Sequence, residues 1–333
     1  MNEIGGYFQL ELNYNNENAF PFQYSELLNS GRYAFEYLIL NLPNKPSLIW
    51  LPWYTCEVML EPLLRLGINY DFYKINSNLE ISSLPKIGNN EYIIINNYFG
   101  IKDKYIDKMS SILGDKMIID NSQALFYNNK FGLKSFYSFR KFVGVPDGGM
   151  AITKDRNKIV LDKSISYDKI SHLLCRIDLD ASSGYQNYKK NENNISNIGI
   201  HSMSNLTKQI ISNINFEYIK EKRNRNFSII NSYLSDINLL NIPAIETFSC
   251  PMAYPLLTDD TSLKEILINN RIYIPTFWPN IFKWCKIDSL EYKLGSNLIA
   301  IPINQRYGDN EMRFIANIII DHINKSNKLN TQY

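Results

Sequence analysis

Short runs of consecutive hydrophobic residues alternate with amphipathic segments over the first 155 residues. The continuous runs at 47–52, 91–96 and 116–120 are typical of strands that are buried on both faces of a sheet. Segments with hydrophobic residues at helical spacing lie between such runs, over residues 31–40, 56–66 and 103–113. This alternation predicts an α/β fold with a mainly parallel, doubly wound sheet.

The pattern changes beyond residue 155. A polar and irregular stretch over 155–205 predicts an exposed loop, and a long helix is expected over 206–234. Prolines then separate short hydrophobic runs, with a strand expected at 298–303 and a last helix at 309–324. We therefore predict a large α/β domain over residues 1–235 and a smaller α+β C-terminal domain over residues 236–333.

Composition and charge narrow the class of protein. The chain has 333 residues, of which 45% are hydrophobic and 20% are charged, as in an ordinary globular enzyme. A formal net charge of +2 argues against a nucleic-acid partner or an anionic membrane. No hydrophobic run reaches the length of roughly 18 residues that a membrane helix requires. The first residues also lack the basic and apolar regions of an export signal, so a cytoplasmic location is expected.

Cysteine and histidine give no metal signature. The four cysteines contain no Cys-x-x-Cys pair, and the three histidines form no ligand cluster. A structural zinc site and a disulfide framework are therefore not expected.

Polar residues gather where the predicted parallel strands end. In doubly wound sheets, ligands bind beyond the carboxyl ends of the strands. Residues 30–32, 96–100 and 120–123 follow such strands or open the next helix. We expect these three segments to converge on one site.

An acid and a lysine give this site a specific chemistry. Asp120 ends a hydrophobic strand, and Lys141 follows in an apolar setting between Phe139 and Phe142. Pyridoxal phosphate (PLP) needs such a pair, since a lysine forms a Schiff base with its aldehyde and a carboxylate keeps its pyridine nitrogen protonated. Taken singly, Lys141 could be a solvated surface charge and Asp120 a helix cap.

Five motifs in order resemble one family. They are Asn-Ser-Gly-Arg-x-Ala, Leu-Pro-x-Tyr-Thr, Asn-Tyr-Phe-Gly, Asp-x-x-Gln-Ala and a lysine followed, after five intervening residues, by Asp-Gly-Gly. Over about residues 28–155 the chain resembles the DegT/DnrJ/EryC1/StrS sugar aminotransferases. The resemblance implies the PLP-dependent transferase fold of type I and PLP as cofactor. It also implies a homodimer with a shared active site, in which closed two-fold symmetry relates the subunits.

The resemblance implies a role for each matching residue. Lys141 would bind the cofactor covalently and move the proton between the substrate carbon and the cofactor. Asp120 would pair with the pyridinium nitrogen, and Gln123 would hydrogen-bond the 3-hydroxyl side of the ring. Backbone N–H groups at Gly31 and Arg32 would hold the phosphate at a helix start. The Asp-Gly-Gly turn would let the backbone pass close to the lysine-bearing segment.

Several positions depart from the family pattern. Cys56 stands where the family usually has an aromatic or other large residue, so the cofactor ring could instead lie against Tyr54 or Tyr98. The position of the usual phosphate-binding serine is Phe136, which leaves Ser138 as the nearest candidate. The connection from the acid to the lysine is also shorter than is typical.

Two further segments bear on the substrate. The motif that the family uses to reach the neighbouring subunit's phosphate is reduced here to Gly-Ile-His-Ser-Met-Ser at 199–204, with His201 in its centre. Gln305, Arg306 and Tyr307 could contact an anionic part of the substrate, although a purely structural role is favoured. The nucleotide, the sugar and the stereochemistry of amination stay open.

These observations predict a PLP-dependent aminotransferase. It would move an amino group, from glutamate as donor, to a nucleotide-linked keto-sugar for an amino sugar of a surface polysaccharide such as O-antigen. A different small ketone is an alternative acceptor. A PLP dehydratase of the same fold is less favoured, because histidine replaces the lysine there and this chain has Lys141. A non-catalytic regulatory or scaffold protein of the same fold is the alternative from another class.

Overall fold

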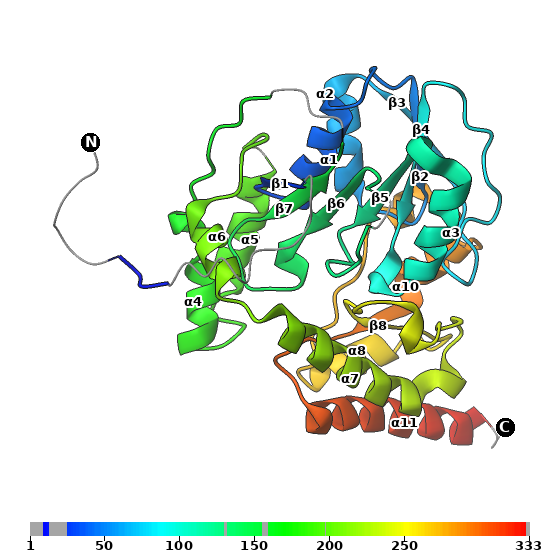
Figure 1. Cartoon of the computed structure of the whole chain (residues 1–333). Coiled ribbons are helices and arrows are strands. Elements are labelled where there is room, and N and C mark those ends of the chain that lie inside the picture. Colours follow the sequence, from blue (N-terminus) through cyan, green and yellow to red (C-terminus); the bar gives the residue numbers. More distant parts are fainter. Residues whose placement is uncertain (1–8, 13–24, 130–131, 155–158, 197, 331–333) are drawn as a thin grey trace.

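A seven-stranded sheet forms the centre of the larger part of the molecule (Figure 1). The computed structural model describes residues 9–12, 25–129, 132–154, 159–196 and 198–330. The strands are β1 (Ser25–Leu28), β2 (Leu48–Pro52), β3 (Asn69–Tyr73), β4 (Glu91–Asn96), β5 (Met117–Asn121), β6 (Ser135–Ser138) and β7 (Gly149–Ile152). Their order across the sheet is β1-β7-β6-β5-β4-β2-β3.

Strand directions agree with the predicted doubly wound fold. Strands β3, β2, β4, β5 and β6 pair in parallel, while β7 runs antiparallel to both β6 and β1. In the register between β4 and β5, Asn96 lies beside Asp120. The carboxyl ends of the parallel strands therefore meet at one edge of the sheet, as the sequence predicts.

Helices cover the sheet because its strands are hydrophobic on both faces. The first three helices are α1 (Gly31–Leu40), α2 (Leu60–Leu66) and α3 (Asp103–Leu113). Ile94 and Ile118 pack with residues of α1 and α2 in one core, whereas Ile95 and Ile119 pack in another that includes residues of α3. Every residue of β5 is buried, which explains its uninterrupted hydrophobic run.

Local capping sets where helices begin and end. Ser30 caps α1, since its hydroxyl accepts a hydrogen bond of 3.3 Å from the amide of Tyr33. Helix α2 ends at Gly67, which has a left-handed backbone with φ of 59°. The sequence predicts both positions, although the first turn of the predicted 56–66 helix is a separate 3₁₀ turn at Glu57–Met59.

A smaller C-terminal layer packs below the sheet in Figure 1. It contains the antiparallel strands β8 (Tyr254–Leu257) and β9 (Leu298–Ile301). Its helices are α8 (Leu263–Asn269), α9 (Ile281–Trp284), α10 (Leu290–Asn297) and α11 (Asp309–Asn330). These elements match the smaller α+β part that the sequence predicts.

Helix α7 (Phe216–Leu234) lies beside α11 (Figure 1). Phe227, Ile230 and Leu234 of α7 pack in a core that also contains residues of β8 and β9. The predicted division at 235/236 would place α7 with the large domain. Its packing favours a boundary ahead of this helix, and the division itself stays a prediction.

Two predictions for the middle of the chain are wrong. Much of the expected loop over 155–205 is helical, with α4 (Ser171–Asp178) and α5 (Tyr185–Ile195), while 155–158 and 197 lie outside the described residues. The polar sequence of α5 reflects exposure rather than irregular backbone, since Asn191 and Ile195 are its buried residues. The expected helix over 206–234 is two helices, α6 (Asn205–Ser212) and α7. They separate because the side chain of Asn215 caps α7 by accepting from the amide of Tyr218.

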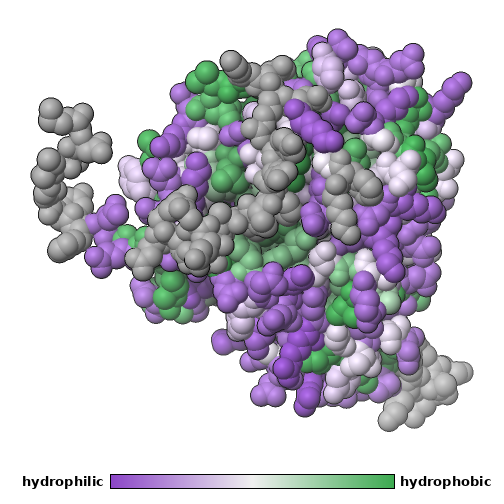
Figure 2. All heavy atoms as spheres, viewed as in Figure 1, coloured by the Kyte–Doolittle hydropathy of each residue, from purple (hydrophilic) through white to green (hydrophobic). Residues whose placement is uncertain are grey.

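The outer surface of the C-terminal layer is polar. On the face shown in Figure 2, hydrophilic residues predominate over α7 and α11. Within the described part of the chain, every helix is too short or too polar to cross a bilayer.

Gly149 allows the start of β7 to pass close to the backbone of Ser30. A Cβ atom at this position would lie 2.2 Å from the backbone carbonyl carbon and oxygen of Ser30. The preceding Gly148 donates its amide to Asn29 and accepts from the amide of Phe139. The Gly-Gly pair thus joins the start of α1 to the segment that carries Lys141.

We predict that Gly149→Ala lowers the free energy of unfolding by about 3 kcal/mol, because backbone must move to admit the methyl group. The matched control is Gly144→Ala, whose added Cβ would meet Leu173 at an ordinary 3.7 Å. Urea unfolding of both variants checks this. Equal midpoints for the two alanine variants would contradict the close approach.

Candidate functional site

Charged and polar residues from several elements share one neighbourhood at the carboxyl edge of the sheet. Burial raises the pKa of the half-buried Cys56 thiol, while the nearby charges of Lys141 and Arg32 act to lower it and that of Asp120 acts to raise it. Cys56 therefore lies within electrostatic reach of all three. The structure brings these four of the predicted site residues into one neighbourhood.

Asp120 is the acid at the end of β5. Its side chain is only 7% exposed, and its Oδ1 accepts a hydrogen bond of 2.8 Å from the amide of Ser122. Burial raises the pKa of this carboxyl, and the charge of Lys141 and the hydrogen bonds from Ser122 offset part of that rise. A cation beside Asp120 would favour the ionised carboxylate.

Lys141 lies beside the same serine. Its Nζ donates a hydrogen bond of 3.2 Å to Ser122 Oγ, so Ser122 connects the acid to the lysine. Sequence reasoning missed Ser122. Its signal was its place two residues after Asp120, in the loop that leads to Gln123.

The expected apolar setting of Lys141 is wrong, since its side chain is exposed. Phe139 and Phe142 are buried in a core cluster with Tyr137 and Met150. The 3₁₀ turn Phe139–Lys141 after β6 directs the aromatic rings into this core and leaves the lysine at the edge of the sheet. Aromatic neighbours in the sequence are therefore not its neighbours in space.

Gln123 presents an unused hydrogen-bond donor. Its Oε1 accepts a hydrogen bond of 2.7 Å from the amide of Phe99, whose backbone has φ of 55°. Within the described structure, the buried Nε2 of Gln123 has no partner. This buried donor is open to an acceptor from a water molecule or a ligand.

The start of α1 packs directly on the end of β6. A Cβ at Gly31 would lie 3.2 Å from both Ser138 Cβ and the carbonyl oxygen of Tyr137. This close packing puts Ser138 next to the N-terminus of α1, where backbone N–H groups favour an anion. Phe136, at the position of the family's usual serine, is buried against Phe35 with ring centroids 5.2 Å apart.

Arg32 is held by an ion pair. Its guanidinium contacts Glu61 Oε2 at 2.8 Å, and its Nε is buried without a partner in the described structure. The ion pair thus fixes the side chain of Arg32, while the backbone of Arg32 stays in the first turn of α1.

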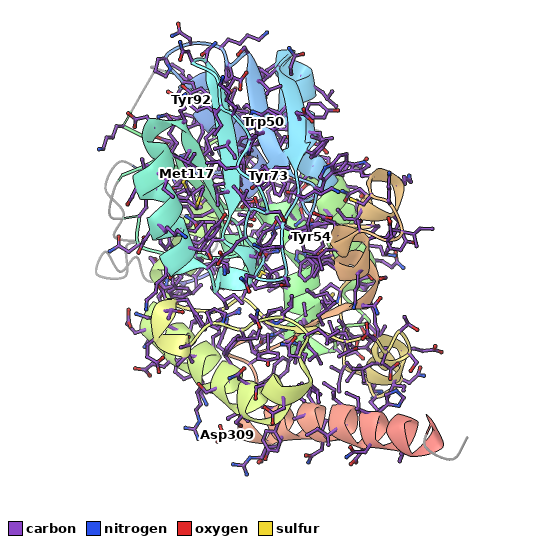
Figure 3. All side chains as sticks on the ribbon, turned by 90° about the vertical axis from the view of Figure 1, so that its right-hand side faces the viewer. Trp50, Tyr54, Tyr73, Tyr92, Met117 and Asp309 are labelled. Atoms are coloured by element: carbon purple, nitrogen blue, oxygen red, sulfur yellow. The ribbon has the colours of Figure 1, made fainter. Side chains whose placement is uncertain are left out.

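Tyr54 lies in a buried aromatic cluster between the sheet and the C-terminal layer (Figure 3). Its ring centroid is 4.6 Å from that of Trp278 and 5.8 Å from that of Tyr98, and its carbonyl oxygen accepts a hydrogen bond from the Tyr98 hydroxyl. Trp278 has an unusual backbone φ of 59°. Of the three residues considered for the face of a cofactor ring, only Cys56 is partly exposed.

Other predicted candidates have structural contacts. The backbone oxygen of His201 accepts from the amide of Asn29, and the histidine lines a cavity of about 470 Å³ with Lys163 and Lys169. The Asp147 carboxylate accepts from the amide and hydroxyl of Ser204 and so anchors the start of α6. Among the described residues, no three His, Cys, Asp or Glu side chains cluster as metal ligands do.

Comparison with known proteins gives matches in structure alone. No family model and no curated protein matches the sequence. A DegT DnrJ EryC1 StrS aminotransferase from Brucella abortus superposes with a TM-score of 0.61 and 14% identity, over 90% of this chain and 85% of its own. The E. coli GDP-4-keto-6-deoxy-D-mannose-3-dehydratase, with bound hydrated PLP, gives 0.62 and 17% over 92% and 90%.

A third match is Helicobacter pylori PseC, an aminotransferase involved in the biosynthesis of pseudaminic acid. It has a TM-score of 0.58 and 17% identity, over 89% of this chain and 86% of its own. At such identities the likeness establishes the fold. The chain thus has the type I fold of PLP enzymes, as found in the DegT/DnrJ/EryC1/StrS sugar aminotransferases and in related PLP enzymes that act on sugars.

Proposed function

We propose that the protein is a PLP-dependent aminotransferase that moves an amino group from glutamate to a nucleotide-linked keto-sugar. The observation that carries the proposal is the arrangement of Asp120, Ser122 and Lys141 at the carboxyl edge of this sheet. It supplies a buried acid and an accessible amine, joined through the amide and the hydroxyl of one serine, in a fold that solved PLP enzymes share.

The residues of the site fit the cofactor. The buried Asp120 would hold the pyridinium nitrogen, which supplies the cation that its environment favours. The unpartnered Nε2 of Gln123 would donate to the 3-oxygen of the ring. The first turn of α1 and Ser138 would hold the phosphate, and Cys56 would lie against the ring. When bound, PLP supplies an electron sink for the substrate bonds at the amino-bearing carbon.

Lys141 would perform the proton transfer. Its Nζ would hold the cofactor covalently and, once the donor's amino group has displaced it, would take the proton from the donor's carbon as a free amine. In the reverse half of the reaction it would give a proton to the carbon of the acceptor that gains the amino group. Ser122 Oγ would orient this amine by the hydrogen bond seen in the structure. The exposure of Lys141 leaves it open to substrates arriving from solvent.

The substrate class is supported by structural neighbours. One is named for GDP-4-keto-6-deoxy-D-mannose, and another, DesI, was solved in the presence of its TDP-sugar product. We extend this class to the present chain and propose a role in making an amino sugar for surface polysaccharide. Lys141 favours amino transfer over dehydration, because the family resemblance implies a histidine in place of this lysine in the dehydratases.

A homodimer would complete the enzyme. Leu174 and Ile177 of α4, with Leu179 after it and Tyr185 of α5, are exposed by 47%, 78%, 68% and 51%. These side chains belong to two helices in contact with each other and the residue between them, and exposed apolar groups gathered in one region mark an interaction site. We propose that a second copy of the chain covers it, in a closed two-fold arrangement.

Covalent binding of PLP through Lys141 is the first prediction. The protein mixed with PLP should show the absorption band of lysine-bound cofactor, and glutamate should bleach it. Borohydride reduction followed by peptide mapping should place the label on Lys141. Lys141→Met should give neither the band nor the label, because it lacks the amine.

Lys104→Met is the matched control, since Lys104 is an exposed lysine on α3. It should behave as the wild type. A wild type that binds no PLP would refute the enzyme proposal and leave a non-catalytic protein of this fold. A band that glutamate leaves unchanged would refute glutamate as the donor.

The raised pKa of Asp120 predicts a pH-dependent stability in protein free of PLP. Ionising a carboxyl whose folded pKa is raised destabilises the fold, so stability should fall as the pH rises above the unfolded value of about 3.9. The fall should level off once the pH exceeds the folded pKa. Asp120→Asn should lack this component. Urea unfolding of both proteins between pH 4 and 8 tests it, and a pH-independent difference between them would contradict it.

Ile177→Asp should dissociate the proposed homodimer, because it places a charge in the apolar surface. Sedimentation velocity at fixed protein concentration measures the result. The control is Ile112→Asp on α3, where the isoleucine is 57% exposed and outside this surface. A wild-type monomer, or a dimer that survives in Ile177→Asp, would argue against this interface.

A further inference from the structure

Arg223 of α7 is a buried arginine without an acidic partner. It is 2% exposed, and among the described residues no carboxylate lies within ion-pair distance of its guanidinium. Burial lowers the pKa of this group to about 10. A buried charge is costly, so the acceptors that surround it indicate what it is held for.

One side of the guanidinium holds the residue after Lys141. Arg223 donates to the carbonyl oxygen of Phe142 at 3.3 Å, and the guanidinium carbon lies 4.7 Å from the centroid of the Phe142 ring. Gln305 donates to the same carbonyl at 2.9 Å and accepts from Arg223 Nε at 3.1 Å. The two side chains thus form a closed hydrogen-bonded ring around the Phe142 carbonyl. We call this pair of side chains the clamp.

The other side holds the segment that leads into β8. Arg223 donates to the carbonyl oxygens of Met252 at 2.8 Å and of Pro251 at 3.4 Å. The amide of Met252 donates to the carbonyl of Phe99, whose own amide donates to Gln123. One hydrogen-bonded path therefore runs from Gln123 to the turn that carries Lys141.

Lysine could not replace this arginine in the path. The planar guanidinium donates in several fixed directions at once and stacks on an aromatic ring, whereas an ammonium group is a compact point charge. The geometry also gives Gln305 a structural role instead of contact with an anionic substrate. Arg223 and Gln305 both contact the carbonyl of Phe142, the residue after Lys141, rather than the Lys141 amine itself.

We propose that Arg223 and Gln305 are positioning residues that fix Lys141 through the Phe142 carbonyl and tie its turn to Gln123. The catalytic half of this inference rests on the proposed function of Lys141. Loosening the turn would misplace the amine during proton transfer. It would leave the groups that bind the amino donor intact.

The test compares Arg223→Lys and Gln305→Met with a control on the same helix. The control is Arg225→Lys, since Arg225 is 62% exposed and pairs with Asp309. Hydrogen exchange in protein free of PLP measures the amides of Phe142 and Val143, both of which donate to Phe139. Steady-state kinetics of the holoenzyme then separates kcat from KM.

We expect both clamp variants to exchange these two amides at least about tenfold faster than the control, with global stability measured in parallel. We expect kcat to fall by about tenfold to a hundredfold, with KM for the donor little changed, because misplacement of a reacting group acts on the chemical step. If Arg223→Lys does not fold, Gln305→Met carries the test, as it keeps the buried charge.

Three outcomes decide the inference. Unchanged exchange in both variants would overturn the clamp. Faster exchange with an unchanged kcat would overturn the positioning role. A wild type that neither binds PLP nor transaminates would refute the proposed function, and the exchange rates of the variants would still decide whether the clamp holds the turn.

Discussion

Burial of the central sheet on both faces is the constraint on which the rest of the structure depends. Strands such as β5 bury every side chain, so polar chemistry is confined to the carboxyl ends where the strands stop. Asp120 and Asn96 stand side by side in this register, and Ser138 ends the next strand along. The site is thus the place where a hydrophobic layer runs out, and loops from different parts of the chain supply its partners.

Electrostatics inside this edge make the site incomplete by itself. Asp120 is buried, and the exposed Lys141 and the hydrogen bonds from Ser122 offset only part of the cost of ionising its carboxyl. The unused donor of Gln123 points the same way. A planar, cationic and hydrogen-bonding ligand, such as the proposed cofactor, would satisfy both at once.

Local sequence signals predicted much of the fold and several of the residues that lie at the carboxyl edge of the sheet. The strand runs, the Ser30 cap and the end at Gly67 depend on neighbours within a few positions, so they could be read directly. The setting of Lys141 could not, because a 3₁₀ turn separates its direction from that of Phe139 and Phe142. Arg223 needed three-dimensional information, since its acceptors lie up to 82 positions away in the chain.

The backbone strain at Trp278 has a consequence for how this part of the protein could change by substitution. A tryptophan with positive φ costs of order 1–3 kcal/mol in backbone strain, and packing against Tyr54 and Tyr98 holds it there. The cluster that holds it lies between the sheet and the C-terminal layer, and Tyr54 and Tyr98 join it from the segments that follow β2 and β4, at the same edge of the sheet as Asp120. Substitutions within the cluster could release the strain and change the packing between the sheet and the C-terminal layer, while the sheet itself stays unaltered. A change in the packing partners of Trp278 would therefore alter the surroundings of this edge of the sheet from the side of the C-terminal layer.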